Sequence, residues 1–166
     1  MKRSWMAVFA LGLAVILSLS LFGCRKTEDN EASGGHFSVQ YKGVTLEIGQ
    51  PAEEVLKALS DPVSKKEIGD CGGLGAQVRY DYSSLILYVL ESKDGAVIDQ
   101  ITLTDDLVAT EKGICIGDSQ DKVKEAYGNV IQSDGSRLVY TSGDNQLIFE
   151  IKDGKVSGID LMQITQ

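Results

Sequence analysis

The amino-acid sequence predicts an α+β fold: an antiparallel sheet with helices packed on one face, built from two tandem copies of one unit and preceded by a β-hairpin. The first observation is an internal repeat, because residues 48–59 match residues 116–127 without gaps at an offset of 68. The second is that the segments after each match are short apolar or alternating runs, which is typical of strands. The third is that Gly- and Asp-containing turns separate these runs.

The repeat predicts two copies of a helix followed by a three-stranded meander, at about residues 43–104 and 113–162. Its matched starts are Ile48-Gly49 and Ile116-Gly117. Farther along, Lys93-Asp94-Gly95 matches Lys152-Asp153-Gly154, and Gln100-Ile101 matches Gly158-Ile159. Together the two copies account for almost all of a single globular domain at residues 37–166.

Each expected element has a local reason. A leading hairpin, residues 37–41 and 44–48 around Lys42-Gly43, would add edge strands to the sheet. Helices are expected at 51–59 and 119–127, where apolar residues recur at helical spacing. Pro51 suits the first helical position, Asp118 suits an N-cap, and Gly128 suits a C-terminal stop. The expected strands are residues 78–82, 85–90, 97–103, 137–140, 146–151 and 155–162, with a further short strand before the second helix.

The first 24 residues indicate export. Lys2 and Arg3 precede an apolar stretch that ends in Leu21-Phe22-Gly23-Cys24. That tetrapeptide resembles a bacterial lipobox, which implies cleavage before Cys24, so that residues 1–23 are a signal peptide, and thioether-linked diacylglycerol on Cys24. Two acyl chains suffice for stable anchoring, outside the cytoplasm, on the cell membrane or on an outer membrane if the source has one. The alternative is an uncleaved transmembrane anchor, at the short limit of length for spanning a bilayer.

Residues 24–36 are polar and contain a single alanine as their only aliphatic residue after Cys24. Such a segment cannot bury enough surface to fold, so it is expected to be a disordered tether. Removal of residues 1–23 takes away two cations and no acid, which changes the net charge from −8 to −10. A charge of this sign disfavours nucleic acid and anionic lipid as partners.

The pattern of residues 113–128, Gly-Ile-x-Ile-Gly-Asp-Ser with Val123 and a closing Tyr127-Gly128, precedes a Tyr-containing strand and a Lys-Asp-Gly hairpin. It resembles small envelope lipoproteins of Gram-positive gut bacteria. In architecture the repeat is similar to the tandem-repeat β-lactamase inhibitor proteins and to the small lipoprotein of the outer-membrane β-barrel assembly machine. The resemblance covers nearly all of residues 37–162 and implies protein binding without catalysis. No binding motif matches, so no contact residue is carried over.

Few residues suit catalysis or a metal. His36 is the single histidine and ends the tether, so neither a His-dependent triad nor a zinc site with several imidazoles is easily built. Asp105-Asp106 lacks the spacing of a calcium loop. The glycine-rich loop that starts at Cys71 leads into a strand, whereas phosphate-binding loops lead into a helix. We therefore expect no enzyme activity, no metal and no cofactor.

Cys71 and Cys115 are two further thiols in an exported chain, and an even number allows a disulfide. Linking them would close a loop of about 45 residues and stabilise the fold by roughly 4 kcal/mol on the chain-entropy model. Against pairing, Cys115 lies between Ile114 and Ile116 and should face away from them. Separate, inert thiols are the alternative.

Four strand tyrosines are the candidate binding face: Tyr80, Tyr82, Tyr88 and Tyr140. Cross-strand packing is the ordinary role of such residues, but tyrosines on the uncovered face of a sheet form a patch suited to protein recognition. The sequence therefore supports a non-catalytic protein-binding or scaffold lipoprotein with an unidentified protein partner. The alternative is a lipoprotein that binds a small ligand or metal, which a well-formed apolar pocket would favour.

Overall fold

The structure is a computed structural model that describes residues 36–70, 75–128, 130 and 132–164, all within the unit Ser33–Gln166. The elements, in chain order, are β1 (Ser38–Tyr41), β2 (Val44–Glu47), α1 (Ala52–Leu59), β3 (Ser64–Asp70), β4 (Ala76–Asp81), β5 (Leu85–Ser92), β6 (Gly95–Leu103), α2 (Gln120–Tyr127), β7 (Gln132–Ser133), β8 (Arg137–Ser142), β9 (Asn145–Lys152) and β10 (Lys155–Gln163).

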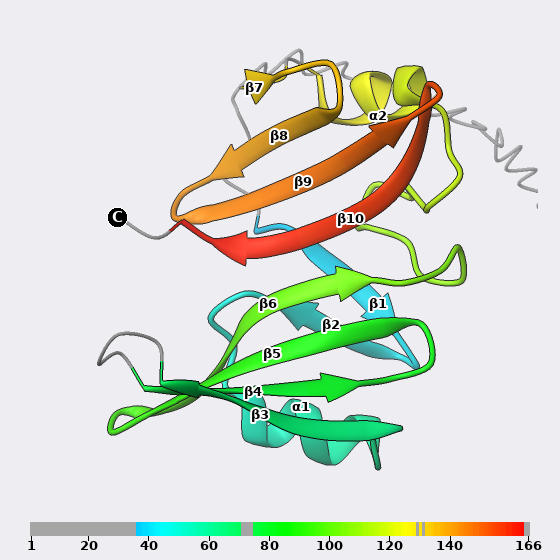
Figure 1. Ribbon diagram of the computed structural model, residues 1–166. Helices are drawn as coiled ribbons and strands as arrows, with labels where there is room; N and C mark the ends of the chain where they lie inside the picture. The colour runs from blue at the N-terminus through cyan, green and yellow to red at the C-terminus, as the bar shows by residue number, and fades with distance from the viewer. Residues whose placement is uncertain (1–35, 71–74, 129, 131, 165–166) are drawn as a thin grey trace, which may run out of the picture. The chain divides into compact units, whose positions relative to one another are not determined.

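Eight of the strands form one sheet in the order β3-β4-β5-β6-β10-β9-β8-β7 (Figure 1). Every neighbouring pair is antiparallel. The first four strands of the sheet meet the last four where β6 pairs with β10, with Ile101 opposite Leu161 and Leu103 opposite Ile159. The predicted α+β class with an antiparallel sheet is confirmed.

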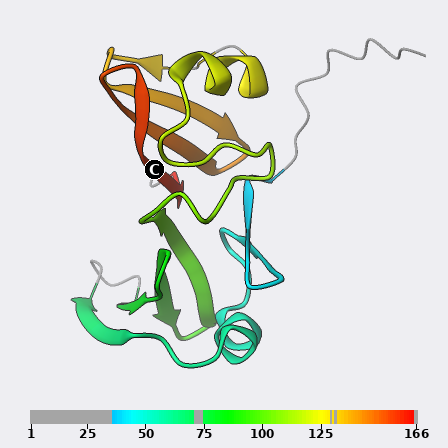
Figure 2. The same cartoon turned by 90° about the vertical axis from the view of Figure 1, so that its right-hand side faces the viewer.

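The N-terminal hairpin forms where it was predicted, but it does not extend the large sheet. β1 and β2 pair only with each other in a two-stranded sheet, which lies beside the larger one in Figure 2. Lys42 and Gly43 have φ values of 50° and 80°, as a tight turn of this hand requires. The expectation of edge strands is wrong because Val39 and Leu46 are fully buried, so the hairpin contributes apolar surface to the core.

Helix α1 starts one residue later than the sequence suggests. Pro51 is the N-cap and has an extended backbone, with φ −55° and ψ 122°, and its missing N–H costs no hydrogen bond there. The helix buries Ala52, Val55 and Leu59, which lie on one stripe at helical spacing.

Helix α2 is capped by Ser119, whose Oγ accepts a hydrogen bond of 3.2 Å from the backbone N–H of Lys122. The predicted N-cap, Asp118, is therefore wrong by one residue. The Asp118 carboxylate instead accepts 2.8 Å and 2.7 Å bonds from the Cys115 N–H and from Lys122 Nζ, which fix the loop before the helix. Gly128, at φ 74°, closes α2 as predicted.

Two strands of the sheet were not predicted. Every residue of β3 is exposed, and β7 consists of two exposed residues. Both lie at the edges of the sheet and bury no side chain, so their sequences lack the apolar alternation that reveals a strand. Conversely, the short strand expected before the second helix does not form: residues 113–118 contain turns, and Ile114 is fully buried without sheet pairing.

The two Lys-Asp-Gly tripeptides occupy different places in their hairpins. The β5–β6 hairpin turns at Lys93-Asp94, whereas the β9–β10 hairpin turns at Asp153-Gly154. The expected match between these tripeptides is thus displaced by one residue. Gln100-Ile101 and Gly158-Ile159 lie on the paired strands β6 and β10, where Gln100 is opposite Met162 and Ile101 is opposite Leu161.

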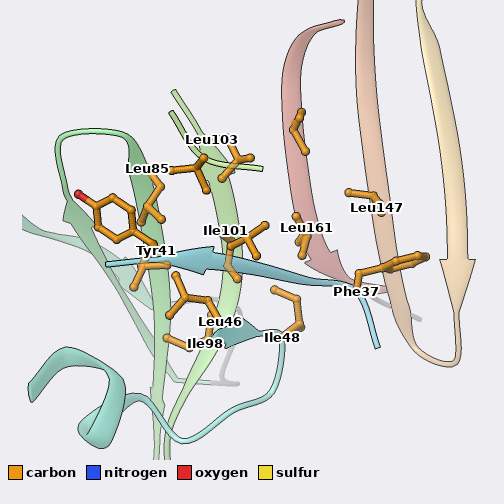
Figure 3. Close-up of a cluster of buried hydrophobic side chains, with 14 of the residues drawn as sticks. Phe37, Tyr41, Leu46, Ile48, Leu85, Ile98, Ile101, Leu103, Leu147 and Leu161 are labelled. Atoms are coloured by element: carbon orange, nitrogen blue, oxygen red, sulfur yellow. The ribbon is translucent and has the colours of Figure 1, made fainter. Parts of the chain in front are cut away.

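The core lies on one face of the large sheet. In β5, for example, Leu85, Leu87 and Val89 are fully buried, while the residues between them are partly exposed. Figure 3 shows Leu46 from the N-terminal hairpin, beside Ile98 and Ile101 of β6. This strict alternation leaves the opposite face of the sheet partly exposed.

Candidate functional site

Three of the four candidate tyrosines are core residues. Tyr80, Tyr82 and Tyr140 are only 7%, 6% and 4% exposed. Tyr88 is partly exposed, because it alternates with the buried Leu87 and Val89. A binding face on this sheet can therefore include Tyr88 but not the other three tyrosines, and that part of the expected site is corrected.

We call the partly exposed side of the sheet the open face. Strand alternation and pairing place the following residues on it: Arg79, Asp81, Ile86, Tyr88, Gln100, Thr102, Arg137, Val139, Gln146, Ile148, Glu150, Asp160 and Met162. Apolar side chains of Ile, Val, Met and Tyr are thus interspersed with amides and charged groups. Mixed surfaces of this kind are usual where proteins bind one another.

A polar group occupies the centre of the open face, where β6 pairs with β10. Thr102 Oγ1 donates a 2.5 Å hydrogen bond to Asp160 Oδ1. Gln100 Nε2 donates to the same oxygen at 3.2 Å and to Thr102 Oγ1 at 3.1 Å. The side chains of Thr102 and Gln100 therefore hold the Asp160 carboxylate in one position.

The charges of the open face differ in how they are compensated. Arg79 Nε lies 2.6 Å from Asp81 Oδ1, and Arg137 lies 2.9 Å from Glu150 Oε1. Asp160 has hydrogen bonds but forms no ion pair with any residue that the structure describes. A negative charge without a cation of its own therefore remains at the centre of this face.

Tyr88 is held by its cross-strand neighbour. Arg79 lies opposite Tyr88 in the β4–β5 pair, with its guanidinium carbon 6.0 Å from the ring centroid. The hydrogen bond from Arg79 to Asp81 raises the pKa of the guanidinium, so this cation stays charged at every accessible pH. The arrangement presents a partly exposed aromatic ring beside a compensated ion pair.

A shallow hollow of about 190 Å³ opens on the β7–β9 end of the open face. Its lining residues are Gln132, Asp134, Arg137, Val139, Gln146 and Ile148. Val139 and Ile148 face each other across β8 and β9 and supply the apolar surface, while the remaining four residues are polar. The hollow has room for one side chain or a comparably small group.

Cys115 has no features of a reactive thiol. It is half-buried, and burial, followed by the charge of Asp118, raises its pKa and keeps the thiol protonated. Its sulfur is free in the described part of the chain. Cys71 lies outside the described residues, so the disulfide between the two stays a prediction.

His36 is exposed at the start of the described chain. Among residues 36–70, 75–128, 130 and 132–164, no group of three His, Cys, Asp or Glu side chains is placed to hold a metal ion. In the same ranges no helix is long and apolar enough to cross a membrane. The signal peptide, Cys24 and nearly all of the tether lie outside these ranges, so lipidation stays a prediction.

Sequence reasoning missed most of the open face. Asp160, Thr102 and Ile148 were read only as members of strands, although each is the alternate residue between two buried neighbours. The alternation of these residues with apolar ones in the sequence could have indicated that they lie on the face opposite the core. The pairing of β6 with β10, which brings Thr102 to Asp160, joins residues 58 apart and has no local signal.

No protein-family model matches the chain, and no curated protein matches it significantly. Among solved structures, the chain is similar to the crystal structure of a DUF4309 family protein (YjgB) from Bacillus subtilis, at 15% sequence identity. The match covers 66% of this chain and 76% of that one, with a TM-score of 0.36.

Proposed function

We propose that this protein is a lipoprotein anchored through Cys24 on the outer side of a membrane, and that it binds another protein through the open face without catalysing a reaction. The observation that carries the proposal is the open face itself. It spans both halves of the sheet and combines partly exposed Ile86, Tyr88, Ile148 and Met162 with an uncompensated carboxylate. Apolar anchors surrounded by polar groups are typical of protein-binding surfaces.

The lipid anchor that the sequence predicts also supports this proposal. The lipobox-like Leu21-Phe22-Gly23-Cys24 and the polar residues 25–36 would hold the folded domain at the membrane surface on a short tether. A domain held in this way meets other proteins of the same surface at high local concentration.

We also propose that the domain consists of two copies of one unit, with both helices on the core face of the sheet. Gly49 N–H donates to the Ile98 carbonyl at 2.8 Å, and Gly117 N–H donates to the Val156 carbonyl at 2.8 Å. These bonds join the chain before each helix to the last strand of each half. β6 and β10 each carry a register shift against the preceding strand, at Asp99 and at Ser157. Equivalent bonds and equivalent irregularities support duplication.

Under this duplication Thr102 and Asp160 are equivalent residues, and so are Ile86 and Ile148. Thr102 pairs with Asp160 itself, Ile86 pairs with Thr102, and Ile148 pairs with Asp160. The open face would therefore have a local two-fold relationship centred on the Thr102–Asp160 pair.

A small-ligand function is the second candidate, and the hollow over Val139 and Ile148 is the observation that favours it. Its volume of about 190 Å³ is below the range of about 300 to 1,000 Å³ that is usual for small-molecule pockets. The hollow therefore suits one side chain of a protein partner better than a free metabolite.

The proposal is tested with Tyr88→Ser in the full-length protein. Loss of the Tyr88 ring should weaken capture of the partner from the source envelope at least tenfold, because the exposed part of the ring would contact the partner. It should lower the thermal midpoint of unfolding by only a few degrees, because the side chain is only partly buried. Glu54→Ser, at an exposed position of α1, is the matched control and should leave capture unchanged. Unchanged capture by the Tyr88→Ser protein contradicts a binding role for this face.

A further inference from the structure

The hollow on the open face lies directly beside the uncompensated carboxylate. Ile148, in the wall of the hollow, is opposite Val139 on one side and opposite Asp160 on the other. Side chains directly opposite each other on one face of an antiparallel pair have Cβ atoms about 4.5–5.5 Å apart. An apolar site and an anionic site are thus one strand apart.

The other charged side chains around the hollow already have polar partners. Arg137 forms its 2.9 Å ion pair with Glu150. Asp134 Oδ1 accepts three hydrogen bonds, from the Ser136 N–H at 2.9 Å, the Ser136 hydroxyl at 2.8 Å and the Arg137 N–H at 2.9 Å. Asp160 receives only neutral donors, from Thr102 and Gln100. Of the three carboxylates, Asp160 has neither the ion pair of Glu150 nor the third hydrogen bond of Asp134, so it gains most from a cation.

The other half of the sheet has the same arrangement of strands and side chains, but it lacks the hollow and the carboxylate without an ion pair. Ile86 is opposite Thr102 on one side and opposite Asp81 on the other. Thr102 carries no charge, and Asp81 is paired with Arg79 at 2.6 Å. Ile86 is therefore an internal control for Ile148: the same side chain on the same face, without a free carboxylate beside it.

We propose that the hollow over Val139 and Ile148 receives an apolar side chain of a basic partner protein, and that Asp160 pairs with a Lys or Arg next to that side chain. This inference rests on the proposed function and names the partner's chemistry. The net charge, −8 for the whole chain and −10 without residues 1–23, adds long-range attraction for a basic partner. Arg suits the site especially, because its planar fork can bind a carboxylate held in a fixed position.

The test uses the full-length protein in detergent micelles, with labelled Ile and Val methyl groups observed by NMR. The probe is the blocked peptide acetyl-Thr-Leu-Thr-Arg-Thr-amide, in which the Leu and Arg side chains lie on the same side of an extended chain. Addition of the peptide should shift the methyl signals of Ile148 and Val139 and leave those of Ile86 unchanged. Replacement of the peptide's Arg by Gln should weaken binding about three- to fivefold at low salt.

Variants of the protein separate the two parts of the site. Asp160→Asn should weaken the Arg peptide about three- to fivefold and leave the Gln peptide unaffected. Ile148→Ser should weaken both peptides about tenfold through lost apolar contact, whereas Ile86→Ser should have no effect.

Three results would overturn the inference: no shift at Ile148, equal shifts at Ile86 and Ile148, or affinity that depends on neither the peptide's Arg nor Asp160. Tight binding of acetyl-leucine amide alone, with no gain from Arg, would assign the hollow to a small ligand and overturn the inference as well. The proposed function is contradicted by a different result from the one that contradicts this inference. If the peptide does not bind but the Tyr88→Ser protein loses its partner, this inference is wrong while the open face remains the binding surface.

Discussion

Thr102 and Asp160 face each other across the central pair of strands, and Thr102 Oγ1 donates a 2.5 Å hydrogen bond to Asp160 Oδ1. The two residues come from opposite halves of the chain, and their strands join four strands to four in one sheet. The fully buried Ile101 and Leu161 lie opposite each other beside them on the core side. The Thr102–Asp160 pair therefore both joins the two halves of the sheet and forms the polar centre of the open face.

A double-mutant cycle measures this link. Thr102→Val and Asp160→Asn should each lower the free energy of unfolding by about 1 kcal/mol, because each weakens a charge-assisted hydrogen bond that is partly exposed. The double variant should lose less than the sum, with a coupling of about 0.5–1 kcal/mol in urea unfolding. Additive losses would mean that the bond does not form in solution.

The Tyr140 hydroxyl provides a second test. It is buried, with no hydrogen-bond partner among the described residues, and burial raises the pKa of the phenol. Tyr140→Phe should therefore keep the free energy of unfolding or raise it by up to about 1 kcal/mol, because it removes a buried polar atom that gains nothing. Tyr140→Ala should instead cost about 3–5 kcal/mol, because the ring packs against Tyr127 and Phe149. A loss above 1 kcal/mol for Tyr140→Phe would reveal a partner for the hydroxyl.

Because of Asp118, the free energy of unfolding should depend on pH in the acidic range. The Cys115 N–H bond, followed by the Lys122 bond, lowers the pKa of Asp118 below its usual value of 3.8. Since the folded pKa is lower than the unfolded one, this stabilisation is fully present above the unfolded value and is lost as the pH falls through the folded value. Asp118→Asn should flatten the fall in stability below pH ~4, and an identical pH profile for the variant would contradict this.

Lipidation is tested at Cys24. Cys24→Ser should abolish incorporation of labelled fatty acid and release the protein from the membrane fraction, because the thioether has no sulfur on which to form. Labelling that persists in the variant, or a mature N-terminus at another residue, would show that the lipobox assignment is wrong.

Sequence patterns predicted the elements whose side chains enter the core. Strands such as β5, with Leu85, Leu87 and Val89, and both helices could be found because burial leaves a period of 2 or 3.6 residues in the sequence. The same rule explains the failures: β3 and β7 bury nothing, and the N-terminal hairpin alternates like an edge strand but packs on the core.

Most residues of the candidate site could not be predicted from the sequence. An aromatic residue in a strand is equally compatible with either face, and only the register of β4 and β5 separates Tyr88 from Tyr80 and Tyr82. Asp160 becomes distinctive only once β10 pairs with β6, since its single local property is to be polar between the buried Ile159 and Leu161.

The central claim is that the open face binds another protein, and a photo-crosslinking residue in place of Tyr88 tests it most directly. The matched control carries the same residue in place of Glu54, which is exposed on α1. Irradiation of intact cells should give one defined higher-mass adduct from position 88 and none from position 54, because crosslinking requires contact within a few ångströms. Absence of an adduct at position 88, or the same adduct from both positions, would contradict the claim.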